Sequence, residues 1–159
     1  MIPIKDDNPT RTFPFVTLGL IAVNIAVFAR ELSAGPELAA MIDKWAFSPA
    51  AFAANPASPE VWLTIITAMF LHGGFLHIIG NMLYLWIFGN NVEDRLGAIP
   101  FLAFYLVCGV IASLAQAVAS AGSSAPLIGA SGAVAGVLGA YALFYPRASV
   151  TTLLPIFFF

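Results

Sequence analysis

One serine lies among small residues in a pattern that would suit a nucleophile. Ser131 is the third residue of the segment Gly129-Ala130-Ser131-Gly132, which opens an apolar run long enough for a helix. The two glycines leave the hydroxyl uncrowded and allow a substrate backbone to approach. The free N–H groups of a first helical turn can stabilise an oxyanion. The segment also fits a purely structural role, because membrane helices pack through small residues.

A histidine and an asparagine share one helix face in an earlier apolar run. His77 and Asn81 are four residues apart, so their side chains point the same way. Two hydrogen-bonding side chains aimed at one point could bind the oxyanion of an acyl-transfer reaction; the alternative is an interhelical hydrogen-bonded pair. We expect no metal or cofactor, since one His and one Asn offer too few good ligands. His72, beside a Gly-Gly pair, fits an interfacial or loop-ordering residue better than a catalyst.

The composition indicates a membrane protein. Of the 159 residues, 60% are hydrophobic and only 9% are charged, whereas a soluble domain carries roughly 25% charged residues. The mean hydropathy of +0.93 agrees. A net charge of −2 argues against nucleic acid as a partner, because phosphates require a basic patch. The single cysteine, Cys108, excludes a disulfide within the chain.

Four apolar runs are candidate membrane spans, because a helix crosses a bilayer with about 20 mostly apolar residues. The polar stretch 31–60 is not expected to span, 61–71 is expected to be interfacial, and GNNVEDRLG at 89–97 is expected to be a polar turn. We predict an all-α, polytopic helix bundle with a tail at 1–12 and a membrane domain at 13–159. The predicted spans cover residues 13–29, 75–88, 100–119 and 127–144.

Positive charge predicts the orientation of this bundle. A cytoplasmic N-terminus places four cationic residues inside and two outside, which favours that orientation under the positive-inside rule. Ser131 and the His77/Asn81 pair would then lie at similar depth near the outer face. A fifth apolar run begins at 150 and is too short to cross by Phe159, so we expect the natural protein to be longer. The inside residues are Lys5, Arg11, Arg95 and Arg147, and the outside residues are Arg30 and Lys44.

Three segments resemble, in order and spacing, the motifs of the rhomboid intramembrane serine proteases of the bacterial type. HGGFLHIIGN at 72–81 is similar to the second-span motif that contains H-x-x-x-N. GNNVEDRLG at 89–97 is similar to G-x-x-x-E-x-x-x-G, and residues 129–132 are similar to G-x-S-G. The resemblance implies a six-span bundle, of which this sequence would hold four spans and the start of a fifth.

The resemblance also implies roles for single residues. Ser131 would be the nucleophile of a Ser-His dyad. His77 and Asn81 would bind the oxyanion together with the backbone N–H of Ser131. Glu93 would be structural, tying its segment to the neighbouring helices. The motif glycines would be structural as well, and they are Gly89, Gly97, Gly129 and Gly132.

Two departures from the family pattern bear on these roles. The family's general base is a histidine on the sixth span, which this sequence does not reach, and a serine without a base stays protonated. The chain by itself is therefore expected to be inactive. Gly136 and Gly139 would let the nucleophile helix pack against that sixth span. Many members carry Trp-Arg before the second span, where Leu63 and Thr64 stand here.

The implied activity is hydrolysis of peptide bonds in or near transmembrane segments of membrane proteins whose helices unwind easily. The implied location is the bacterial inner membrane. The alternative is a rhomboid-like pseudoprotease that binds membrane clients without cutting them. Other intramembrane proteases fit less well, because the sequence has no H-E-x-x-H zinc motif and its aspartates fall outside the predicted spans. A transporter would place its polar groups nearer the midplane.

Overall fold

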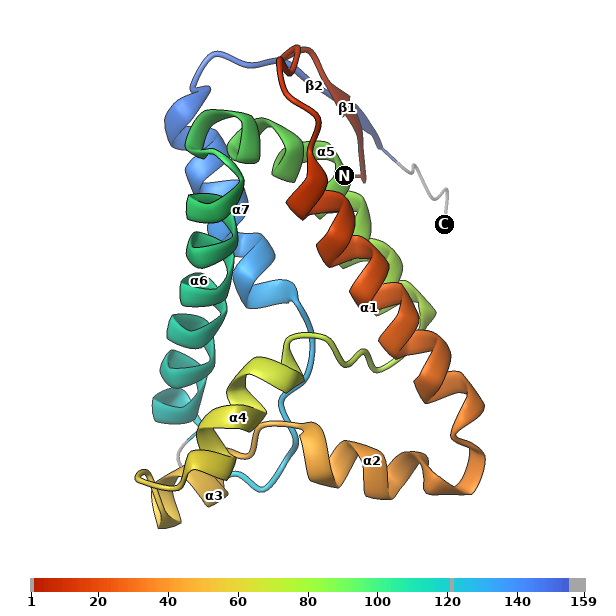
Figure 1. Cartoon of the computed structure of the whole chain (residues 1–159), viewed down its shortest axis with the longest axis vertical. Helices are drawn as coiled ribbons and strands as arrows, with labels where there is room; N and C mark the ends of the chain where they lie inside the picture. Colours follow the sequence, from red (N-terminus) through yellow and green to blue (C-terminus); the bar gives the residue numbers. More distant parts are fainter. Residues whose placement is uncertain (1, 121, 155–159) are drawn as a thin grey trace.

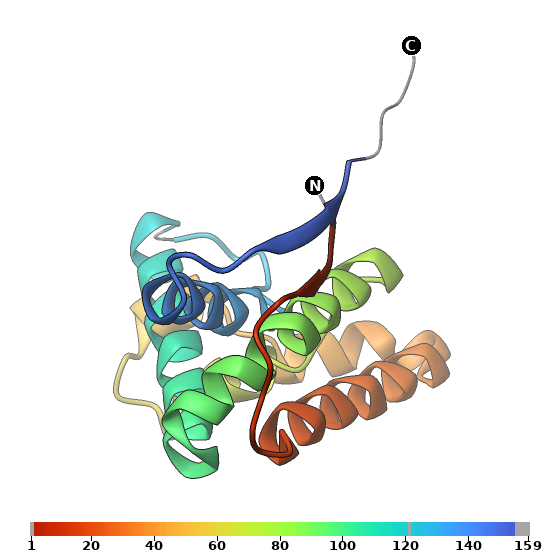
Figure 2. The same ribbon diagram turned by 90° about the horizontal axis from the view of Figure 1, so that it is seen from above.

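The computed structural model describes residues 2–120 and 122–154, most of which are helical. A central helix organises the described bundle, because α5 contacts the three other long elements around it. Figure 2, viewed from the N-terminal end of α1, shows α1 on one side of α5 and the α6–α7 pair on the other. These helices are α1 (Phe15–Ser33), α5 (Phe75–Leu96), α6 (Ala98–Ala119) and α7 (Ser131–Phe144).

The exposed surface of this bundle is strongly apolar. Leu76 and Ile99 are 88% and 83% exposed, while Leu85 and Phe101 are fully buried in the core. By length and composition α1 and α6 could each cross a membrane, and α7 is a shorter apolar helix. An apolar shell around a packed core is costly in water but favourable in lipid. The predicted all-α membrane bundle is confirmed.

A set of short helices lies across the end of the bundle opposite the N-terminal end of α1 (Figure 1). Ser48 and Ser58 begin two of them, because each side-chain oxygen accepts a hydrogen bond from a backbone N–H in the first turn. The indole of Trp62 donates to the carbonyl of Pro56 at 2.9 Å. The expected separate segment before the second span is thus a short helix. The elements are η1 (Gly35–Glu37), α2 (Leu38–Trp45), α3 (Pro49–Ala54) and α4 (Pro59–Ala68).

The predicted polar turn at 89–97 is wrong. Helix α5 continues through this segment to Leu96 and ends at Gly97, whose φ of +86° suits glycine. Two of the polar side chains here are buried, since Asn91 and Glu93 are 1% and 3% exposed. Their hydrogen-bond partners come from the N-terminal part of the chain, which allows the helix to continue.

Helix α7 begins later than its apolar run suggests. Residues 127–130 are not helical, and Gly129 has a φ of +118°, outside the helical region. The backbone of Leu127 instead pairs with Phe47 through two hydrogen bonds of 3.1 and 2.8 Å. Ser131 is consequently the first residue of the helix.

A two-stranded antiparallel sheet joins the two ends of the chain. β1 (Ile2–Asp6) pairs with β2 (Val150–Leu153), so the expected fifth apolar run begins as a strand and not as a helix. β-branched residues at 150–152 favour this conformation. The Asp6 carboxylate fixes β1 to the bundle by accepting hydrogen bonds from Asn91 Nδ2 and the Tyr141 hydroxyl at 2.7 and 2.9 Å. The end of the run, 155–159, lies outside the described residues.

Candidate active site

The segment before Ser131 is held against α4. The backbone N–H of Gly129 donates to the carbonyl of Ala68 at 2.8 Å. Together with the Phe47–Leu127 pair, this bond fixes the approach of the chain to α7. Ser131 itself is exposed at the start of the helix. Its hydroxyl therefore lies on an anchored turn, beside N–H groups that the first turn of a helix leaves without intrahelical partners.

His77 packs directly on the backbone of Gly129. A Cβ atom on Gly129 would lie 2.6 Å from both Cε1 and Nε2 of His77, closer than real contacts allow. The φ of +118° disfavours a side chain for a second reason. The first glycine of the 129–132 segment is therefore required by contact and by conformation. The His77 ring therefore contacts the backbone two residues before Ser131.

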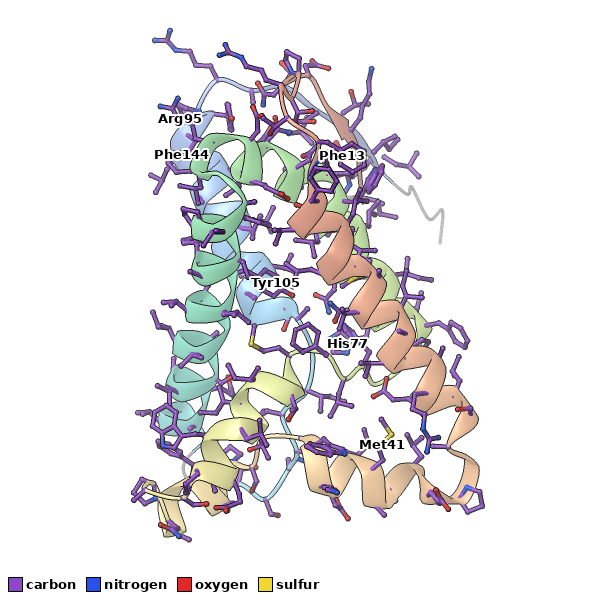
Figure 3. The ribbon with its side chains drawn as sticks, in the orientation of Figure 1. Phe13, Met41, His77, Arg95, Tyr105 and Phe144 are labelled. Atoms are coloured by element: carbon purple, nitrogen blue, oxygen red, sulfur yellow. The ribbon has the colours of Figure 1, made fainter. Side chains whose placement is uncertain are left out.

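One hydrogen bond sets the tautomer of His77. The backbone N–H of Gly73 donates to Nδ1 at 3.3 Å, so Nδ1 carries the lone pair in the neutral ring. The proton then resides on Nε2, the atom that faces Gly129. His77 is accordingly a hydrogen-bond donor toward the start of α7. Figure 3 labels this half-buried side chain.

Asn81 adds a second donor one turn further along α5. Its side chain is 8% exposed, and among the described residues its Nδ2 has no hydrogen-bond partner. An unpaired buried donor costs about 1–3 kcal/mol, so it calls for an explanation. Asn81, His77 and Ser131 line one groove of about 340 Å³ between α5 and α7. The structure thus brings together all three residues that the sequence singled out.

A second cavity lies on the other side of the first turn of α7. It has a volume of about 280 Å³ and lies between α4, α6 and α7. Ser131 and Gly132 form one wall, while Ser113 and Gln116 supply polar side chains from α6. Gln116 could not be predicted as a site residue, since the residues that share the cavity with it come from distant segments. Ser131 therefore has a groove on one side and a polar cavity on the other.

Two glycines allow α7 to pack closely on α6. A Cβ on Gly132 would lie 2.4 Å from the Cβ of Ala112, and one on Gly136 would lie 2.4 Å from the sulfur of Cys108. The Gly132/Gly136 pair is thus a close-packing face, as the spacing predicts. Gly136 was expected to face a sixth membrane span outside this sequence, and this is wrong. Helix α6, which corresponds to the predicted span at 100–119, packs against Gly136 instead. A Cβ on Gly139 would meet nothing within 4 Å among the described residues.

The Glu93 carboxylate caps the N-terminus of α1. Its Oε1 accepts from the N–H of Val16 at 2.9 Å, and its Oε2 accepts from the N–H and hydroxyl of Thr17 at 2.8 and 2.7 Å. A Cβ on Gly89, one turn earlier, would lie 3.0 Å from Thr17 Cγ2, so this glycine permits the close approach of α1 and α5. An anion at a helix N-terminus is favourable. Gly97 ends the helix, as described above.

Replacing Glu93 by Gln is expected to destabilise the fold by about 1–3 kcal/mol, since the new NH₂ group would face a buried donor. The measurement is the thermal unfolding midpoint in detergent micelles, compared with Asp94→Asn. Asp94 caps the Thr12 N–H at 2.8 Å in a more exposed position. We expect Asp94→Asn to lose less stability than Glu93→Gln, because water can replace the hydrogen bonds of the more exposed Asp94 carboxylate. Equal losses of stability in the two variants would contradict the role of Glu93 as a buried cap of α1.

His72 is buried and lines neither cavity. Its side chain is 3% exposed, and its ring lies edge-on to that of His77 with centroids 5.0 Å apart. Burial, followed by the neighbouring His77, lowers the pKa of His72 to about 4. The ring is therefore neutral near pH 7. Its position fits the predicted loop-ordering role better than contact with a substrate.

The structure thus combines an apolar helix bundle with a serine at a helix start and two potential hydrogen-bond donors in the same groove. Residues 59–158 match the Rhomboid domain, and the chain belongs to the rhomboid family. Presenilin-associated rhomboid-like protein, mitochondrial, of Homo sapiens is 33% identical over 144 residues, which cover 89% of this chain and 36% of that relative. Rhomboid protein 1, mitochondrial, of Saccharomyces cerevisiae is 36% identical over 92 residues, or 55% of this chain and 27% of that relative. The chain thus spans about a third of the length of the human relative.

Proposed function

We propose that the chain is part of an intramembrane serine endopeptidase that hydrolyses peptide bonds in or near the transmembrane segments of membrane proteins. The observation that carries the proposal is the groove shared by Ser131, His77 and Asn81. Its lining combines an exposed serine with two side chains whose N–H groups can donate. Such an arrangement suits the tetrahedral intermediate of acyl transfer.

The proposed reaction begins with attack of Ser131 Oγ on the scissile carbonyl carbon. The hydroxyl proton passes to a general base, and the carbonyl oxygen becomes an oxyanion. His77 Nε2–H, Asn81 Nδ2–H and the N–H groups at the start of α7 donate to that oxygen. The base protonates the leaving amine, and water then releases the acyl group from Ser131.

The base is proposed to be a histidine from outside this sequence. The chain has two histidines; His77 is a donor toward the site, and His72 lines neither cavity. Ser131, Ala135 and Gly139 form an exposed stripe of small side chains on α7. Small residues let membrane helices approach closely. A helix carrying the base would pack along this stripe and bring its imidazole to Ser131.

The cavity beside Gln116 supports a route for water or for a substrate side chain. It adjoins Ser131 and is lined on another side by Ala68 and Met69, at the end of the short helix α4. Polar groups in a membrane protein generally line protein-enclosed or wet space, because lipid offers no hydrogen bonds. A substrate helix would have to unwind locally to present an extended bond in the groove.

We further propose a bacterial inner membrane location with the site facing outward. Figure 3 shows Arg95 at the end that carries the β1–β2 sheet, and Met41 at the opposite end. Four of the six cationic residues lie toward the end that carries the sheet and two toward the opposite end. The positive-inside rule therefore favours a cytoplasmic position for the end with the sheet. The catalytic groove would then open toward the outer leaflet.

Asn81→Ala is expected to slow cleavage by up to about 10²–10³-fold, because one oxyanion donor is removed. The loss falls mainly on kcat and becomes smaller where His77 compensates. Initial rates on a model membrane substrate, measured at saturating and at limiting concentrations, separate the effect on kcat from the effect on KM. The matched control is Asn55→Ala, at an exposed position in the loop between α3 and α4. A change in KM alone would contradict the oxyanion role.

The proposal as a whole is tested on the full-length protein in liposomes with a transmembrane substrate. We expect cleavage, together with covalent labelling by a fluorophosphonate that mass spectrometry maps to Ser131. The chain of 159 residues is expected to show neither. Stable substrate binding with no cleavage and no labelling of the full-length protein would instead favour the pseudoprotease alternative.

A further inference from the structure

Glu31 is a carboxylate buried near the outer end of α1, where lipid or core would favour an apolar residue. It is 3% exposed. In the described part of the chain, no Lys or Arg side chain forms an ion pair with it, and the adjacent Arg30 donates to Ser33 Oγ at 3.5 Å. Burying an acidic side chain without a partner is expensive. Its position therefore points to a specific hydrogen-bonding task.

The partner of Glu31 is the loop that precedes α5. Its two carboxylate oxygens lie 3.1 and 3.3 Å from the backbone nitrogen of His72, which donates to them. On the far side of the same loop, Phe28 of α1 packs edge-on against Phe75 with ring centroids 5.2 Å apart. Helix α1 thus holds both ends of the Gly-Gly segment at 73–74. Glycine pairs are flexible, so the geometry of this segment depends on such anchors.

The segment anchored in this way contacts a residue of the site. The N–H of Gly73, one residue after the anchored His72, is the donor that leaves the lone pair of His77 on Nδ1 and the proton on Nε2. We propose that Glu31 is a positioning residue: by holding the 72–73 backbone it selects the His77 tautomer that donates into the groove. The inference rests on the proposed function only where it predicts an effect on catalysis.

Loss of this anchor would reverse the hydrogen-bonding sense of His77. With the proton on Nδ1, Nε2 would present a lone pair to the oxyanion and repel it, although Ser131 and Asn81 remain in place. The expected cost approaches that of removing one oxyanion donor, up to about 10²–10³-fold in kcat. Substrate affinity should change little, since neither the groove nor the Gln116 cavity contains Glu31.

The experiment uses the full-length protein with ¹⁵N-labelled histidine, reconstituted in lipid. Ring ¹⁵N shifts report directly which nitrogen of His77 carries the proton. The variants are Glu31→Met, which has similar length but no acceptor; Glu31→Gln, whose amide oxygen can still accept from the His72 N–H; and Glu37→Gln, an exposed control on η1. Cleavage kinetics are measured on the same samples.

We expect the Nε2–H tautomer in the wild type, in Glu31→Gln and in Glu37→Gln. In Glu31→Met we expect the Nδ1–H form to gain population and kcat to fall at unchanged KM. A folded Glu31→Met protein with an unchanged His77 tautomer would overturn the inference. If Glu31→Met does not fold, Glu31→Asp replaces it, because its shorter side chain withdraws the carboxylate from the loop. Faster exchange of the His72 amide proton in Glu31→Asp than in Glu37→Gln supports the anchor, and equal exchange overturns it. Absence of cleavage in the wild type, with the tautomer responding as expected, would defeat the proposed function and leave the inference standing.

Discussion

Replacing Ser131 by alanine in the full-length protein is expected to abolish cleavage of a membrane substrate. The loss should be on the order of 10⁴-fold or more, as expected when the nucleophile of a serine hydrolase is removed. Substrate binding should persist, because the groove and the cavity beside the serine keep their walls. Cleavage in liposomes and binding measured in parallel separate the two effects.

The matched control is Ser124→Ala, an exposed serine in the loop seven residues before the site. It should cut at the wild-type rate. Turnover by the Ser131→Ala protein above the level of an empty liposome would refute the nucleophile assignment. Loss of cleavage in both variants would indicate that the loop, and not the hydroxyl at 131, had been disturbed.

Gly129→Ala should reduce cleavage by about 10²-fold, the cost of moving a catalytic group by roughly 1 Å. The added Cβ would lie 2.6 Å from His77 Nε2, so the ring must move away from the groove. The positive φ adds a penalty of about 1–3 kcal/mol to folding. The unfolding midpoint and kcat should therefore both fall.

Gly122→Ala distinguishes conformational strain from the contact with His77. Gly122 also has a positive φ, of +83°, but a Cβ there would meet nothing within 4 Å among the described residues. We expect it to lower stability without lowering the kcat of the folded fraction. Equal kcat losses in the two variants would show that the Gly129–His77 contact has no role in the site.

Much of the site follows from the sequence. The i, i+4 spacing of His77 and Asn81 and the glycines around Ser131 require only local geometry, and topology places them at one depth. Their meeting in a single groove agrees with that prediction. The Gly132/Gly136 face could also be predicted, because small residues four apart mark close helix packing.

The sequence misled where the partner of a polar group is distant. Residues 89–97 look like a turn because their polar side chains suggest water, yet Glu93 meets Thr17 across 76 positions. Asp6 likewise meets Tyr141, 135 positions away, and this contact anchors a strand that the charged tail does not suggest. Local patterns carry no information about such long-range pairs.

Glu31 illustrates the same difficulty at the site itself. A charged residue at the end of an apolar run usually marks the membrane boundary, so the first span was expected to end at 29. The helix instead continues to Ser33, and the Glu31 carboxylate is buried because the N–H of His72 satisfies it. Only the folded chain shows that partner.

The central claim is that Ser131 and the donors of His77 and Asn81 act on the same oxygen atom. The most direct measurement is the structure of the full-length protein after reaction with a fluorophosphonate. We expect a phosphoryl oxygen about 2.7–3.1 Å from both His77 Nε2 and Asn81 Nδ2, with phosphorus bonded to Ser131 Oγ. A phosphoryl oxygen directed away from both side chains, or phosphorus attached to another residue, would contradict it.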